Sequence, residues 1–120
     1  MKKHENIDYF RDILDSIVEI EAFVKGLDFS NFKTDRKTIL AVIRDIEVIG
    51  EAAKKISRLI RKNYPEIPWK DIAGMRDKLI HGYFGIDLDI LWETIRQDLP
   101  QLKIHISKLI EEEEEEDSEK

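Results

Sequence analysis

An arginine and a histidine, Arg76 and His81, stand five positions apart in the segment MRDKLIHGYFGID. An arginine side chain stays charged and offers a planar fork of donors to phosphate oxygens. A histidine side chain can take or give a proton near neutral pH. Because RNA carries its own nucleophile, the 2′-hydroxyl, such a pair could cleave a phosphodiester without a serine or a metal ion. The two residue types therefore point to RNA as a candidate substrate.

The spacing of Arg76 and His81 limits how they can act together. On one continuous helix, five residues turn through about 500°, so the two side chains would point about 140° apart. They could meet if the helix ends at His81 and Gly82 lets the chain turn. Alternatively, a two-fold dimer could bring the arginine of one copy to the histidine of the other. The spacing alone leaves both arrangements open.

Each of these residues also has an ordinary structural interpretation. Arg76 could be the ion-pair partner of Glu47 or Glu51, which share one face of a predicted helix. His81 could sit at a helix end and Tyr83 in the core. Glu47 and Glu51 could also orient Arg76. Lys78 could add affinity for phosphate, or it could be a solvated surface lysine.

No metal site is predicted. The chain has no cysteine, and His4 and His105 have no second histidine at a ligand spacing.

Apolar residues recur at helical spacing through most of the chain. A first helix is expected up to Gly26, a second from Asp35 to about Ile60, and a short one from about Trp69 to His81 with Gly82 as its left-handed cap. The last helix is expected over 88–109, and Pro100 should kink or divide it. Short connections favour antiparallel neighbours. The predicted fold is an all-α up-and-down bundle of four helices plus a short helix, with a kinked last helix.

Composition limits the class of protein. The chain has 120 residues, of which 42% are hydrophobic and 38% charged. This length supports one core, and we expect a single domain over residues 1–110. No stretch approaches the roughly 20 apolar residues of a membrane span, and no export signal is apparent. The sequence therefore predicts a cytoplasmic protein.

The net charge of −6 is unevenly distributed. Residues 111–120 hold eight acidic residues and one basic residue, and we expect a disordered acidic tail there. Residues 33–78 hold 12 basic and 7 acidic residues, a net charge of +5. This basic middle third permits an anionic partner but does not demand one.

The motif and its flanking segments resemble a known family. MRDKLIHGYFGIDLDILWETI, preceded by IPWKDIAG and by IRDIEVIGEAAKKIS, is similar to the HepT-like family of HEPN domains. The resemblance runs from the first helix to about Leu109. Arg-x4-His alone is a weak signal, whereas Arg-x4-His-x-Tyr with these flanking segments is specific.

The resemblance implies a helical homodimer whose Arg76 and His81 motifs meet in a cleft at the interface. It implies a metal-independent endoribonuclease, without cofactors, that acts as the toxin of a type VII toxin–antitoxin pair. The antitoxin would have a nucleotidyltransferase fold and could transfer AMP to Tyr83. An added adenylate would place bulk and negative charge where RNA must approach. The alternative within the family is a non-catalytic module that binds a nucleotide or a protein partner.

Overall fold

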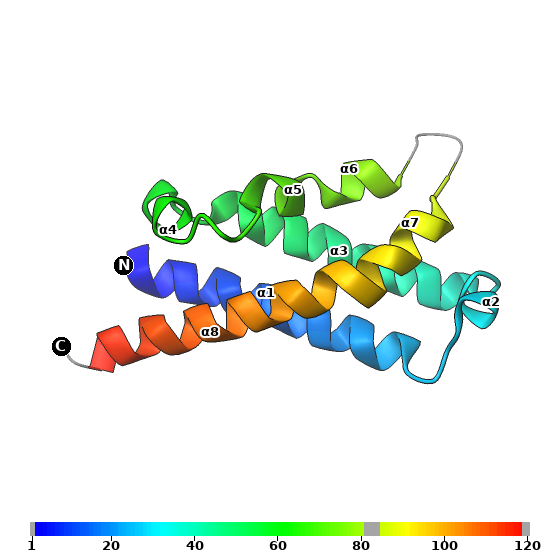
Figure 1. The fold of residues 1–120 in the computed structure, drawn as a ribbon, viewed down its shortest axis with the longest axis horizontal. Coiled ribbons are helices and arrows are strands. Elements are labelled where there is room, and N and C mark those ends of the chain that lie inside the picture. Colours follow the sequence, from blue (N-terminus) through cyan, green and yellow to red (C-terminus); the bar gives the residue numbers. More distant parts are fainter. Residues whose placement is uncertain (1, 81–84, 119–120) are drawn as a thin grey trace.

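The chain makes four passes along one long axis, and each pass runs antiparallel to the one before it (Figure 1). The computed structural model describes residues 2–80 and 85–118, with side chains described within 6–80 and 85–115. The elements are α1 (Lys2–Val24), α2 (Phe29–Phe32), α3 (Arg36–Lys55), α4 (Arg58–Asn63), α5 (Trp69–Ala73), α6 (Met75–Leu79), α7 (Leu88–Glu93), the π-helical turn η2 (Thr94–Asp98) and α8 (Leu99–Ser118). Their order confirms the predicted all-α, up-and-down arrangement. None of the helices in these two ranges is long and apolar enough to cross a membrane.

The antiparallel pair α1 and α3 forms the centre of the bundle (Figure 1). Gly26 ends α1 with a φ of +79°, and the amide of Leu27 donates to the carbonyl of Val24 at 2.9 Å. The carboxylate of Asp35 caps α3 by accepting from the amide of Thr38 at 3.1 Å. Both predicted helix boundaries are therefore confirmed. The backbone conformation of Gly26 is one that residues with a side chain rarely adopt.

Helix α3 is buried around much of its circumference. Its buried apolar residues, together with two alanines, cover more than one face: Ile39, Val42, Ile43, Ile46, Ile49, Ala52 and Ala53. Helix α1 packs on one side of this surface, and α5 and α6 pack on another. The exposed side of α3 is charged apart from Leu40, and it carries the candidate site described below.

The second predicted helix is wrong in its extent, because it is divided at Ile56. Ile56 is extended, with a ψ of 136°, and the Ser57 hydroxyl accepts from the amide of Ile60 at 3.3 Å to begin α4. Asn6 of α1 holds this corner: its side-chain oxygen accepts from the Ser57 amide at 3.2 Å. A new cap and a contact from α1 therefore outweigh the helical periodicity that continues through Ile60.

The short helix expected over 69–81 is also divided. Gly74 separates α5 from α6, and α6 ends at Leu79. Ile80 is extended and pairs with Ile86 in an isolated antiparallel bridge, while the amide of Asp87 donates to the Leu79 carbonyl at 2.9 Å. These contacts engage backbone groups that a longer helix would use. The predicted role of Gly82 as a cap lies outside the described residues.

Pro100 divides the last helix, as expected, through a local change of hydrogen bonding. A proline has no amide hydrogen, so the carbonyl of Arg96 loses its usual helical donor. The amide of Leu99 instead bonds the carbonyl of Thr94, five residues earlier, which is the pattern of a π-helical turn. The kink therefore lies just before the proline.

The first part of the acidic segment continues α8. Helix α8 continues to Ser118. The Tyr64 hydroxyl donates to Glu112 at 2.9 Å, Arg11 of α1 forms an ion pair with Glu114, and Glu113 is buried. These contacts hold part of the acidic segment against the bundle, although its charge alone would favour full exposure to water.

Asp45 is a buried carboxylate between α1 and α3. It is 6% exposed, and its Oδ2 has no hydrogen-bond partner in the described part of the chain. Burial raises the pKa of Asp45 to about 6, and a hydrogen bond and the charge of Glu19 add to this effect, while Ser16 and Arg44 oppose it. The protonated form of Asp45, which can donate a hydrogen bond, is therefore more favoured in the folded chain than in the unfolded chain.

We predict that Asp45 makes the fold less stable as the pH rises. Its pKa is raised above the unfolded value of 3.8, so its stabilising contribution is complete below that value and is lost as the pH rises through about 6. The variant Asp45→Asn should lose this decline and exceed the wild type at pH 8 by about 1–3 kcal/mol in free energy of unfolding. Urea titrations at pH 4 and pH 8 measure the difference.

The exposed Asp15 of α1 provides a matched control. Asp15→Asn should keep the wild-type decline between the two pH values. An Asp45→Asn variant that declines as steeply as the wild type would contradict the assignment.

Candidate functional site

Helices α3 and α5 approach each other closely at Gly50. A Cβ atom at this position would lie 3.4 Å from the carbonyl oxygen of Ala73 and 3.6 Å from that of Ile72. The buried side chains of Trp69 and Ile72 anchor α5 in the core. This approach carries α6, which follows at once, alongside the exposed side of α3.

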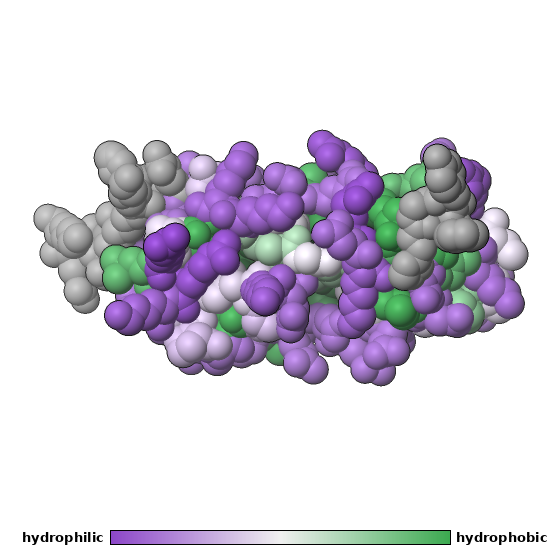
Figure 2. Space-filling view, turned by 90° about the horizontal axis from the view of Figure 1, so that it is seen from above, coloured by the Kyte–Doolittle hydropathy of each residue, from purple (hydrophilic) through white to green (hydrophobic). Residues whose placement is uncertain are grey.

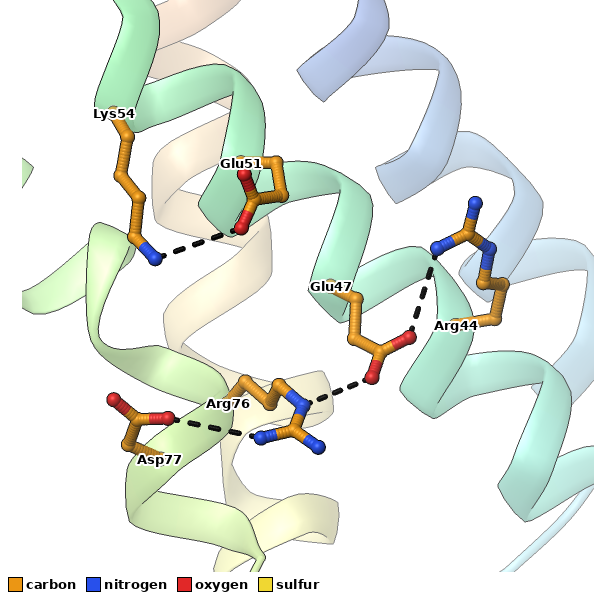
Figure 3. A network of polar contacts seen from close by, with 6 residues as sticks. All are labelled: Arg44, Glu47, Glu51, Lys54, Arg76 and Asp77. Atoms are coloured by element: carbon orange, nitrogen blue, oxygen red, sulfur yellow. Dashed lines mark hydrogen bonds and ion pairs between the residues drawn. The ribbon is translucent and has the colours of Figure 1, made fainter.

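The approach brings Arg76 of α6 to Glu47 of α3. The Arg76 Nε donates to Glu47 Oε2 at 2.8 Å. Figure 3 shows Glu47 between two guanidinium groups, since its Oε1 lies 3.6 Å from Arg44 Nη1. Asp77 Oδ1 lies 3.8 Å from Arg76 Nη1. Of the two acidic partners that the sequence left open for Arg76, the structure selects Glu47.

A shallow groove of about 400 Å³ runs along these residues. Its lining comes from the exposed side of α3 and from the α5–α6 segment: Arg44, Glu47, Gly50, Glu51, Lys54, Ala73, Arg76 and Asp77. Three of these side chains are basic and three are acidic. The groove is therefore close to neutral, and any attraction for an anion must come from how individual groups are presented.

Arg76 is presented in a way that suits phosphate. Its side chain is 48% exposed, and Glu47 occupies the Nε position. Nη2 has no hydrogen-bond or ion-pair partner among the described residues, and Nη1 lies beyond hydrogen-bond distance of Asp77. The outer edge of the guanidinium can thus donate two hydrogen bonds to phosphate oxygens while Glu47 fixes the inner edge.

The structure does not bring all the predicted site residues to this groove. Glu51 lines it but pairs with Lys54 at 3.5 Å instead of with Arg76. Lys78 faces a second groove, of about 710 Å³, which α8 also lines. His81 and Tyr83 lie outside the described residues.

Arg44 is a member of the site that was not singled out from the sequence. It stands three residues before Glu47 on the same helix, a spacing that places the two side chains side by side. That spacing could have indicated a contact between Arg44 and Glu47, but it is too common on helix surfaces to identify a site. Its contact with Glu47 matters only because Arg76 reaches the same carboxylate from another helix.

Comparison with known proteins identifies the family. A family model described as "Ribonuclease HepT-like" matches residues 13–109. The chain is 48% identical over 107 residues to "Probable ribonuclease HepT" of Thermococcus cleftensis, and the matched region covers 89% of this chain and 97% of that protein. Two proteins of Methanocaldococcus jannaschii named as candidate RNases are also similar. One is 45% identical over 115 residues, covering 96% of this chain and 99% of that protein. The other is 44% identical over 110 residues, covering 92% and 91%.

No solved structure matches the chain significantly. The chain belongs to the HepT-like ribonuclease family. The resemblance drawn from its motif, and the class of enzyme that the resemblance implied, are confirmed.

We predict that bulk at Gly50 separates α3 from α5. In Gly50→Ala the added Cβ reaches ordinary contact distance from the Ala73 carbonyl, so the fold should be retained or gain up to about 1 kcal/mol from helix propensity. In Gly50→Val the two further methyl groups should destabilise the fold by about 1–3 kcal/mol through overpacking. Urea denaturation measures both.

Gly50→Ala is the matched control for this test. The difference between the two variants should exceed the roughly 0.7 kcal/mol that helix propensity alone can explain. Equal stability of the two variants would contradict the close approach.

Proposed function

We propose that this chain is a metal-independent endoribonuclease that acts as the toxin of a type VII toxin–antitoxin pair. The observation that carries the proposal is the half-exposed Arg76 guanidinium, whose Nε is held by Glu47 at 2.8 Å while Nη2 has no partner in the described residues. A pre-oriented arginine at a groove can bind a phosphate with little loss of side-chain entropy. The family to which the chain belongs supports RNA as the substrate.

The proposed reaction uses the 2′-hydroxyl of RNA as the nucleophile. His81 takes the proton of the 2′-hydroxyl, or gives a proton to the departing 5′-oxygen, as general base or acid. The 2′-oxygen bonds to phosphorus as the bond to the 5′-oxygen breaks, which leaves a 2′,3′-cyclic phosphate and a 5′-hydroxyl. Arg76 neutralises the charge that grows on the phosphate oxygens. Glu47 keeps the guanidinium in place and acts as a positioning residue.

The proposal includes a homodimer in which the Arg76 and His81 motifs of two copies share one cleft. The groove beside Arg76 is shallow and open, so one copy encloses little of a substrate. A second copy across a two-fold axis would close it and would add a second arginine and histidine.

The proposal also includes silencing by an antitoxin of nucleotidyltransferase fold. Transfer of AMP from ATP to the Tyr83 hydroxyl forms a phosphodiester and releases pyrophosphate. The added adenylate brings negative charge and bulk within a few residues of Arg76 in the chain. It would repel an incoming RNA phosphate.

Cleavage of single-stranded RNA in the presence of EDTA tests the proposal. The wild type should cut RNA and leave cyclic phosphate ends. Arg76→Ala and His81→Ala should each reduce the rate by about 100-fold or more, because they remove charge stabilisation and proton transfer. Arg36→Ala, which removes an exposed arginine at the start of α3, is the matched control and should cleave as the wild type does.

A folded His81→Ala variant that cleaves as fast as the wild type would overturn the catalytic assignment. In the same assay, pre-incubation with the antitoxin and ATP should silence the wild type but not Tyr83→Phe. Equal silencing of Tyr83→Phe would contradict modification at that tyrosine.

A further inference from the structure

A strongly basic surface lies at the corner where α3 ends and α4 begins. Five basic residues and no acidic residue occur between Ala53 and Tyr64. We call this group the α4 basic patch: Lys54, Lys55, Arg58, Arg61 and Lys62. Arg61 is half-buried and the other four residues are exposed. The patch contains much of the positive charge of the basic middle third.

The contacts of α4 make this patch a rigid platform. Arg61 donates from Nη2 to the Ala53 carbonyl at 2.6 Å and from Nε to the Ile56 carbonyl at 3.2 Å, which caps the C-terminal end of α3. Ser57 caps α4 and is held in turn by Asn6 of α1. The backbone that presents the patch is therefore fixed before any ligand arrives, and its ordering costs nothing on binding.

Arg58 and Lys62 are the two exposed members of the patch that belong to α4. They stand four residues apart on one face of α4, and neither pairs with an acidic side chain in the described part of the chain. Like charges at this spacing repel by about 0.2–0.5 kcal/mol, so they do not serve the stability of the helix. Seen from above, the coloured part of the end that carries α4 shows hydrophilic side chains beside a small hydrophobic area (Figure 2).

The patch continues the groove that contains Arg76. Lys54 belongs to both, because it lines the groove and lies in the last turn of α3. From Glu47 to Lys54 the helix advances roughly 10 Å. The acidic end of α8 borders α4 on another side, where Tyr64 donates to Glu112. A polyanion would be repelled from that side and confined to the α3–α4 side.

We propose that the α4 basic patch is a second contact for the RNA backbone, through which Arg58 and Lys62 hold phosphates a few nucleotides from the one at Arg76. This inference rests on the proposed function and extends it to substrate positioning. Lysine and arginine contacts to phosphates carry affinity without reading sequence. The patch therefore selects for length of single strand on one side of the cleavage site, not for particular bases.

Binding of a fully 2′-O-methylated single-stranded RNA tests the proposal, because this probe lacks the proposed nucleophile and stays intact. Its affinity is measured by fluorescence anisotropy over a salt series for the wild type, for Arg58→Ala/Lys62→Ala, and for Lys25→Ala/Lys108→Ala. The last variant removes two exposed charges elsewhere and is the matched control. The patch variant should bind about tenfold more weakly at low salt. Its slope of log affinity against log salt should be shallower by about 1.4, since each single-strand phosphate contact contributes about 0.7.

On cleavable RNA, the patch variant should raise KM by a similar factor and keep kcat within about twofold of the wild type. Unchanged affinity and salt slope in the patch variant would overturn the proposal. So would intact RNA affinity together with lost binding to a polyglutamate peptide, because the patch would then serve an acidic protein. If the wild type cleaves no RNA, the proposed function fails, while an unchanged salt slope in the binding series still overturns the patch on its own.

Discussion

The close packing of α5 against α3 at Gly50 is the constraint on which the candidate site depends. Nine of the 20 residues of α3 are buried. From Arg44 to the end of the helix, the exposed side is a row of charged residues. Because Gly50 has no bulky side chain, the carbonyls of α5 can lie close to α3 and α6 can follow beside its charged row. Glu47 then meets Arg76 at 2.8 Å, although the two residues stand 29 positions apart. The packing of α5 against α3 therefore also sets the geometry of the candidate site.

Much of the fold could be predicted because helical periodicity and caps are local signals. The turn at Gly26, the cap at Asp35 and the kink near Pro100 each follow from the chemistry of one or two residues. Trp69 is buried in the core, and Trp92 lies 4.9 Å from the ring of Phe32.

The parts of the fold that could not be predicted depend on contacts between segments far apart in the sequence, which helical periodicity does not encode. Ile56 and Ile60 fit the helical pattern of α3, but Asn6 and the Ser57 cap divide the chain between them. Likewise, the acidic run remains helical because Tyr64 and Arg11 reach it from other elements. For the site, the sequence identified Arg76 and both of its possible acidic partners. Only the relative placement of α3 and α6 could choose between them.

Glu47 is proposed to act on RNA cleavage through Arg76, and a double-mutant cycle measures whether the two residues depend on each other. Single-turnover cleavage is measured for the wild type, Glu47→Gln, Arg76→Ala and the double variant, after circular dichroism shows that all four are folded. Glu47→Gln should slow cleavage by about tenfold in the wild type and have almost no effect once Arg76 is absent. Equal slowing by Glu47→Gln in both backgrounds would show that the two residues act independently and that Glu47 does not position Arg76 for cleavage.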